Sequence, residues 1–179
     1  MRAVNYIFQQ IQCSVILATL LCEDEQFDAA EETASHAMDL SENHDQYLLG
    51  KCHYLLGGIQ RSKGNREKAI HHFEASLRIA SVRNSHDKLS RIHLSLADLH
   101  LEEDRFGDAQ VHIEHAKSRA GDDMFLMGCA FYSSARVLSA RNAPEEAKSE
   151  ASRALAIFEK LGATELIEAT RGLLEEIGE

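Results

Sequence analysis

Ten histidines and four cysteines are the side chains of this sequence that could bind a metal ion or attack a substrate. The histidines that lie closest together in the sequence are His71 with His72, His93 with His100, and His112 with His115. His112 and His115 share a helix face, as two zinc ligands would. A structural zinc site needs four ligands, and no third and fourth ligand follow at a fixed spacing. We therefore expect no metal site, and we expect His93 and His100, at apolar positions, to be packed and hydrogen-bonded.

The cysteines do not form a catalytic pattern. A nucleophilic cysteine needs a nearby base and an exposed, electropositive setting. Cys52 precedes His53, but adjacent residues of a helix point apart. The sequence has no Cys-x-x-Cys pair, no glycine-rich phosphate loop, no Gly-x-Ser-x-Gly and no His-Glu-x-x-His. Cys13, Cys52 and Cys129 fall within one residue of the same position of a repeated pattern, so we expect buried, reduced thiols in a protein that is not an enzyme and uses no cofactor.

Length and charge narrow the function classes. The chain has 179 residues, 44% hydrophobic and 27% charged, which suits one globular domain over residues 1–179. A net charge of −10 argues against non-specific binding to nucleic acid or to an anionic membrane surface. The apolar run Val15–Cys22 is too short to span a bilayer, and the glutamines before it are unlike a signal peptide. We expect a cytoplasmic protein that binds neither nucleic acid nor membrane.

A repeated pattern of small residues must position any binding site. Polar turns lead four times to an alanine, and these alanines (Ala30, Ala69, Ala109 and Ala147) lie 39, 40 and 38 residues apart. Twelve residues before each alanine, and seven residues after it, stands another small residue: Ala18, Gly57, Ala97 and Ala135, then Ala37, Ser76, Ala116 and Ala154. Large residues such as Leu17, Leu56, Leu96 and Leu138 stand between them. Small side chains at such spacings mark close helix crossings, with the large residues packed beside them.

The periodicity predicts an all-α fold of four helical hairpins followed by a single capping helix. The segment 41–45, the segment 84–87 and the segment 121–123 offer N-caps, and Pro144 suits the first turn of a helix. The last helix has one apolar face and one face rich in glutamate, whereas Tyr6, Ile7 and Phe8 suggest an interface left open on the first helix. The predicted hairpins cover about 4–41, 46–82, 86–119 and 123–161, and the capping helix covers about 164–177.

This pattern resembles the tetratricopeptide repeat superfamily over nearly the whole chain. Gly57, Ala69 and Ser76, with Leu56 and Phe73, match its signature best. The sequence departs from the family pattern in three ways. The repeat spacing near 39 residues exceeds the usual 34, and the proline that often closes a repeat is missing. The large aromatic residue of the first helix is replaced in all hairpins but one. That position holds Ser14, His53, His93 and Phe131 in the four hairpins. The resemblance implies a right-handed α-solenoid with a concave groove lined by the first helix of each hairpin.

A narrower resemblance is to the repeat tails of fungal NACHT-type, NLR-like proteins. It is carried by 61–64, 68–74, 95–99, 103–106, 148–155 and 158–163. It implies a sensor or scaffold segment related to a larger receptor-like protein.

The superfamily resemblance also places a binding groove on this chain. The groove positions are Gln12, Val15, Thr19, Lys51, Tyr54, Arg61, Arg91, Leu94, Asp98, Tyr132 and Arg136. Four of these residues are basic in an acidic chain, so they could hold an acidic or C-terminal peptide through charge-assisted hydrogen bonds, with the two tyrosines as anchors. The alternative is that they are ordinary surface charges paired with nearby carboxylates.

Two functions remain open at this point. The preferred one is a non-catalytic module that binds a peptide or a partner helix in this groove. The alternative is a structural or oligomerisation tail that forms a homodimer through its N-terminal helix.

Overall fold

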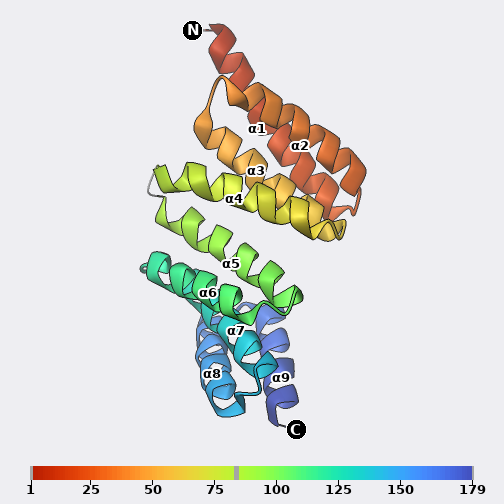
Figure 1. Cartoon of the computed structure of the whole chain (residues 1–179). Coiled ribbons are helices and arrows are strands. Elements are labelled where there is room, and N and C mark those ends of the chain that lie inside the picture. The colour runs from red at the N-terminus through yellow and green to blue at the C-terminus, as the bar shows by residue number, and fades with distance from the viewer. Residues whose placement is uncertain (1, 83–84, 179) are drawn as a thin grey trace. The chain divides into compact units, whose positions relative to one another are not determined.

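The computed structural model describes residues 2–82 and 85–178, with residues 2–5 and Asp87 described by their backbone alone. All regular structure in these ranges is helical, which confirms the predicted all-α fold (Figure 1). The predicted limits of the hairpins and of the capping helix agree with the observed ones to within two residues. The helices are α1 (Arg2–Glu23), α2 (Phe27–Glu42), α3 (Gln46–Ser62), α4 (Arg66–Val82), α5 (His86–Glu102), α6 (Phe106–Ala120), α7 (Met124–Ala140), α8 (Pro144–Leu161) and α9 (Thr164–Gly178).

The chain divides into two compact units, Met1–Asn84 and Ser85–Glu179. In the N-terminal unit the hairpin α1/α2 packs on the hairpin α3/α4 through α2 and α3, and α1 also touches α3. In the C-terminal unit the hairpin α5/α6 packs on α7/α8, and α9 covers α8 and touches α7. The first helices α5 and α7 lie in contact, so their exposed side chains share one surface. A single domain over residues 1–179 stays a prediction.

Local signals start and stop the helices as expected. The Asp45 carboxylate accepts the backbone N–H groups of Tyr47 and Leu48, at 2.7 and 3.2 Å, and Asp123 accepts that of Leu126 at 3.0 Å. Pro144 occupies the first turn of α8. All four hairpin turns contain a residue with positive φ: Glu25, Gly64, Asp104 and Asn142. The same turn geometry therefore closes each hairpin.

The spaced small residues do mark the helix crossings. All the alanines of the pattern are buried. A Cβ on Gly57 would lie 2.8 Å from the Phe73 ring, so this crossing needs glycine. In the α3/α4 hairpin Ser76 Oγ donates to the carbonyl of Gly50 at 2.8 Å, and in α5/α6 Ser90 Oγ donates to the carbonyl of Ala116 at 3.0 Å. The serine stands on opposite helices in the two hairpins, at the same crossing.

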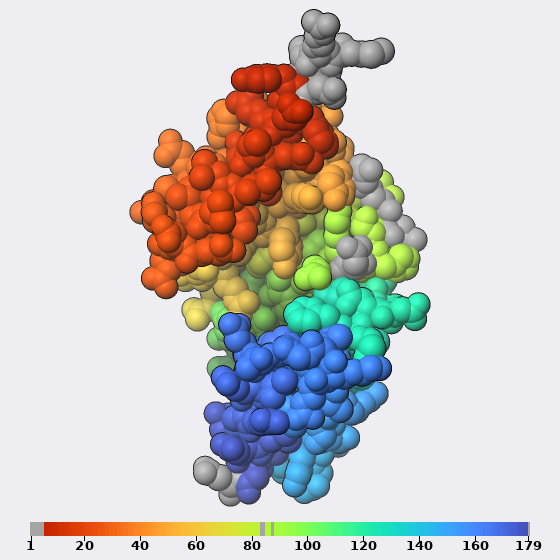
Figure 2. All heavy atoms as spheres, turned by 180° about the vertical axis from the view of Figure 1, so that it is seen from behind, coloured from red at the N-terminus to blue at the C-terminus, as the bar shows by residue number. Residues whose placement is uncertain are grey.

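One face of α1 departs from the expected burial. Tyr6, Ile16, Leu17 and Leu20 are 69%, 60%, 51% and 54% exposed, and Cys13 on the same face is exposed too. The predicted burial of Leu17 and Cys13 is therefore wrong. The reason is that α2 and α3 cover only the opposite side of α1, which holds Ile11 and Ala18. Figure 2 shows α1 in red as the outer layer of its unit.

Of the described helices with eighteen or more residues, only α1 is long and apolar enough to cross a membrane, over Tyr6–Glu23. This corrects the expectation that the apolar stretch is too short. That expectation considered only Val15–Cys22, but the helix continues through the three uncharged glutamines that precede it. The glutamines lower the hydropathy of α1 without adding charge.

Candidate interaction surface

The C-terminal unit brings together three of the predicted groove residues. Arg136 on α7 donates a hydrogen bond from Nη1 to Oδ1 of Asp98 on α5, at 2.7 Å. The guanidinium carbon of Arg136 also lies 5.9 Å from the centroid of the Tyr132 ring, one turn earlier on α7. This cluster joins the first helices of two consecutive hairpins. Its side chains are only half-buried, so a ligand can reach them.

Arg91 adds an exposed cation to the same surface. Its charge acts on the Cys129 thiol of α7, and so does that of Asp98, so both charges lie within electrostatic range of Cys129. Burial raises the pKa of Cys129 to about 11, and the opposing effect of Arg91 is smaller. Cys129 is thus a neutral thiol at physiological pH, half-buried rather than fully buried. We call Arg91, Asp98, Tyr132 and Arg136 the α5/α7 surface.

The N-terminal unit carries its own predicted residues on α3. Lys51 is exposed, with Nζ 4.9 Å above the Tyr47 ring. Tyr54, three residues later, is 38% exposed and its ring centroid lies 5.5 Å from that of Phe73. Arg61 is half-buried near the end of α3. Lys51 and Tyr54 therefore offer a cation and an aromatic ring on one helix face.

The predicted residues on α1 offer less. Gln12 and Thr19 are exposed, and Val15 is half-buried. The Thr19 hydroxyl donates to the Val15 carbonyl at 2.9 Å, so this hydrogen is used within the helix. The remaining predicted groove residue, Leu94, lies on α5 and is half-buried.

Some cations are paired with carboxylates, as the alternative interpretation requires. Arg136 is one of them, through Asp98. Lys63, at the end of α3, bonds both Asp28 and Glu31 of α2 at 2.6 Å. These ion pairs fasten neighbouring helices within a unit.

A second charged cluster was not predicted. In the C-terminal unit Glu150 of α8 accepts from Lys117 of α6 at 2.7 Å and from Arg153 at 2.8 Å. Both cations lie over the ring of Phe131, with Lys117 Nζ at 5.2 Å and the Arg153 guanidinium at 3.8 Å from its centroid. The cluster draws residues from three helices, so sequence spacing alone does not reveal it.

The histidines pair across helices rather than along them. Nδ1 of His53 lies 3.1 Å from Nδ1 of His72, and Nδ1 of His93 lies 2.9 Å from Nδ1 of His112. His100 is 6% exposed, so the predicted packing of His93 and His100 is confirmed. Among the side chains that the structure describes, no three histidine, cysteine, aspartate or glutamate residues are placed to hold a metal ion.

Comparison with known proteins supports a tetratricopeptide repeat. Residues 12–81 match the family model described as tetratricopeptide repeat. No curated protein sequence matches the chain. The structure of BtubC (BKLC) from P. vanneervenii is similar at 17% identity and a TM-score of 0.71, over 98% of this chain and 89% of that one. The putative kinesin light chain TPR-like repeats of Podosopora anserina are similar at 14% identity and a TM-score of 0.70, over 94% and 93%.

A third similar structure is a Rap protein complexed with competence and sporulation factor. It shares 17% identity and a TM-score of 0.61 with this chain, over 94% of this chain and 52% of that one. The chain thus spans about half the length of that Rap protein. The shared fold and the matched repeat segment support the tetratricopeptide repeat superfamily, and the resemblance to fungal NACHT-type tails stays a prediction.

Proposed function

We propose that the chain is a non-catalytic protein–protein interaction module that binds a peptide or a partner helix on the first helices of its hairpins. The repeat match supports this class of function, as does the similar Rap fold, which was solved with a bound factor. The proposal includes a cytoplasmic location and a place within an NLR-like protein.

The observation that carries the proposal is the α5/α7 surface. A guanidinium has five N–H donors, and Arg136 uses one of them in its bond to Asp98. That bond fixes the direction of the arginine, and the remaining donors can bind a carboxylate. Arg91 supplies a second cation, and Tyr132 supplies an aromatic face for an apolar side chain. We infer a ligand with a carboxylate, either an acidic side chain or a free C-terminus, beside an apolar residue.

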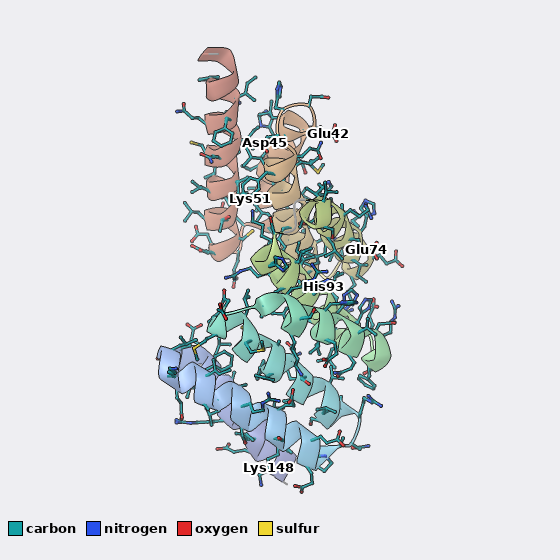
Figure 3. The ribbon with its side chains drawn as sticks, turned by 90° about the vertical axis from the view of Figure 1, so that its left-hand side faces the viewer. Glu42, Asp45, Lys51, Glu74, His93 and Lys148 are labelled. Carbon is teal, nitrogen blue, oxygen red and sulfur yellow. The ribbon has the colours of Figure 1, made fainter. Side chains whose placement is uncertain are left out.

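A peptide array tests this assignment. Peptides with Asp, Glu or a free C-terminus are compared with Asn, Gln or C-terminally amidated counterparts of the same sequence. The acidic peptides should bind. Arg91→Glu should remove most of that binding, because it replaces the cation with a carboxylate that repels the peptide. The variant should still fold, because Arg91 is exposed. Lys148→Glu is the matched control, since Lys148 is an exposed cation on the second helix α8 (Figure 3). Equal binding by Arg91→Glu and Lys148→Glu would contradict the assignment.

As a second candidate function we propose self-association through the apolar face of α1, formed by Tyr6, Cys13, Ile16, Leu17 and Leu20. The occupant is a second copy of the chain, α1 against α1. From Tyr6 to Cys22 the helix carries no charge, in a chain whose net charge is −10. The exposed face of α9 carries four glutamates, so an α1–α9 contact would bury carboxylates. Over Tyr6 to Cys22, an α1–α1 contact brings no charged side chains together.

Light scattering after gel filtration tests the second candidate. The expected result is a dimer at high concentration that Leu17→Glu dissociates. Val111→Glu is the control, because Val111 is an exposed apolar residue on α6. A monomer at every concentration contradicts this candidate, and so does co-sedimentation with phospholipid vesicles, which would assign the face to a membrane.

A further inference from the structure

Two equivalent histidine pairs connect helices inside two of the hairpins. His53 of α3 faces His72 of α4, and His93 of α5 faces His112 of α6. The partners are 19 residues apart in both pairs, and their ring centroids are separated by 5.4 and 5.2 Å. Each pair joins the first helix of a hairpin to the second helix of the same hairpin. We call the two pairs the histidine rungs.

The geometry limits how many protons a rung can hold. At 2.9 to 3.1 Å the two Nδ1 atoms share one hydrogen, so one ring donates and the other accepts. A second proton would place N–H against N–H between two positive rings. The hydrogen bond would be lost and the charges would repel. Double protonation of a rung therefore destabilises the closed hairpin.

The surroundings of the rungs are more cationic than anionic. His115 stacks on His93 at 5.0 Å and His100 stacks on His112 at 5.2 Å, which makes a column of four rings on α5 and α6. The groups acting on this column are Asp108 and Arg119 of α6 and Arg105, which directly precedes α6. The helix α7, which packs on both, carries Cys129, Tyr132 and Arg136, and Arg136 is bound to Asp98.

The rung of the N-terminal unit has similar neighbours. His71, Lys68 and Arg78 act on it from α4, and Glu31 acts on it from α2. The helix α1 is uncharged from Tyr6 to Cys22. Glu31 is itself bonded to Lys63, so its charge is partly compensated.

Burial opposes protonation of the rungs. It is the main reason why the pKa values of His53, His93 and His112 fall to about 4, and it also lowers that of His72. In the unfolded chain these imidazoles titrate near their ordinary value of 6.5. The unfolded state therefore binds protons first, and the stability present above that value is lost as the pH falls towards 4.

We propose that the histidine rungs act as an acid-sensitive latch, which opens the α3/α4 and α5/α6 hairpins in mild acid before the α7/α8 hairpin. In the α7/α8 hairpin the corresponding positions hold Phe131 and Glu150, which both contact Lys117 and Arg153. In the α1/α2 hairpin they hold Ser14 and Thr33. The latch is thus confined to the two hairpins that carry rungs. This inference does not depend on the proposed function.

Thermal unfolding of the full chain tests the latch. The double variant His72→Gln/His112→Gln removes one titrating ring from each rung and keeps an amide that can bond the remaining ring. Between pH 7 and pH 5 the wild-type Tm should fall by about 10 °C, and the fall should be at least halved in the variant. The control His36→Gln/His44→Gln removes two exposed histidines and should behave as wild type. An equal fall in rung variant and control would overturn the proposal.

Hydrogen exchange of the wild-type chain gives a test that needs no variant. After correction for the intrinsic rates, amides of α3 to α6 should lose protection at pH 5, and amides of α7 to α9 should keep it. Uniform loss across all helices would overturn the proposal. The same experiment with EDTA should give the same result, and a change on removing metal would replace the latch with a metal site.

Discussion

Arg136 of α7 and Asp98 of α5 are joined by a 2.7 Å hydrogen bond between side chains that are 31% and 24% exposed. The bond fastens the first helices of two consecutive hairpins and directs the guanidinium of Arg136 at the same time. The bond thus links the packing of the two hairpins to the direction of an arginine on the proposed binding surface.

A double-mutant cycle on this pair should give a measurable coupling. Asp98→Asn and Arg136→Gln each remove one charge, and we expect a coupling free energy of about 0.5–1 kcal/mol from urea unfolding, because the pair is only partly exposed. Purely additive effects would show that the pair does not stabilise the C-terminal unit.

Two adjacent glycines of α3 should respond oppositely to alanine. Gly57→Ala should destabilise the chain by about 1–3 kcal/mol, because the added Cβ would meet the Phe73 ring at 2.8 Å. Gly58 has open space around its Cα, so Gly58→Ala should be neutral or stabilise α3 by up to about 1 kcal/mol. Urea unfolding of both variants measures the difference. A similar effect at both positions would contradict the role given to the small residues.

Removal of the Glu150 carboxylate should loosen the junction of α6, α7 and α8. Glu150→Gln leaves Lys117 and Arg153 close together over Phe131, and we expect a loss of about 1–3 kcal/mol at pH 7. Burial works to raise the pKa of Glu150, but the bond and charge of Lys117 lower it overall.

The contribution of Glu150 should therefore be present above its ordinary pKa of 4.5 and disappear as the pH falls below it. Glu146→Gln, at an exposed position of the same helix, is the control. If Glu150→Gln were as stable as Glu146→Gln at pH 7, the cluster would have no structural role.

Three of the four cysteines should differ in reactivity. Cys13 is exposed and should be alkylated quickly by iodoacetamide at pH 8. Cys52 and Cys129 should react slowly until the chain unfolds, because burial raises the pKa of both thiols. Peptide mapping by mass spectrometry measures the order. Rapid labelling of Cys129 would contradict its neutral state.

The helices could be predicted because their signals are local. Asp45, Asp123 and Pro144 act within one turn of the helix that they start. The small residues also identify the crossings, because a close approach excludes any large side chain, as Gly57 shows against Phe73. Both kinds of signal depend only on residue type and spacing.

Contacts between helices could not be predicted in the same way. The sequence grouped His112 with His115 along one helix, whereas the structure pairs it with His93 across two. The common separation of 19 residues in both rungs was the signal that could have revealed them. Burial of Leu17 was expected because it repeats the position of Leu56 and Leu96, which are buried, but α1 is covered on one side only.

Ligand binding on the first helices of the hairpins should be visible in hydrogen exchange with and without the tightest acidic peptide from the array. We predict slower exchange in α5 and α7 around Arg91 and Arg136, with α6 and α8 unchanged. Protection confined to α6, α8 or α9 would show that the ligand does not bind on the first helices.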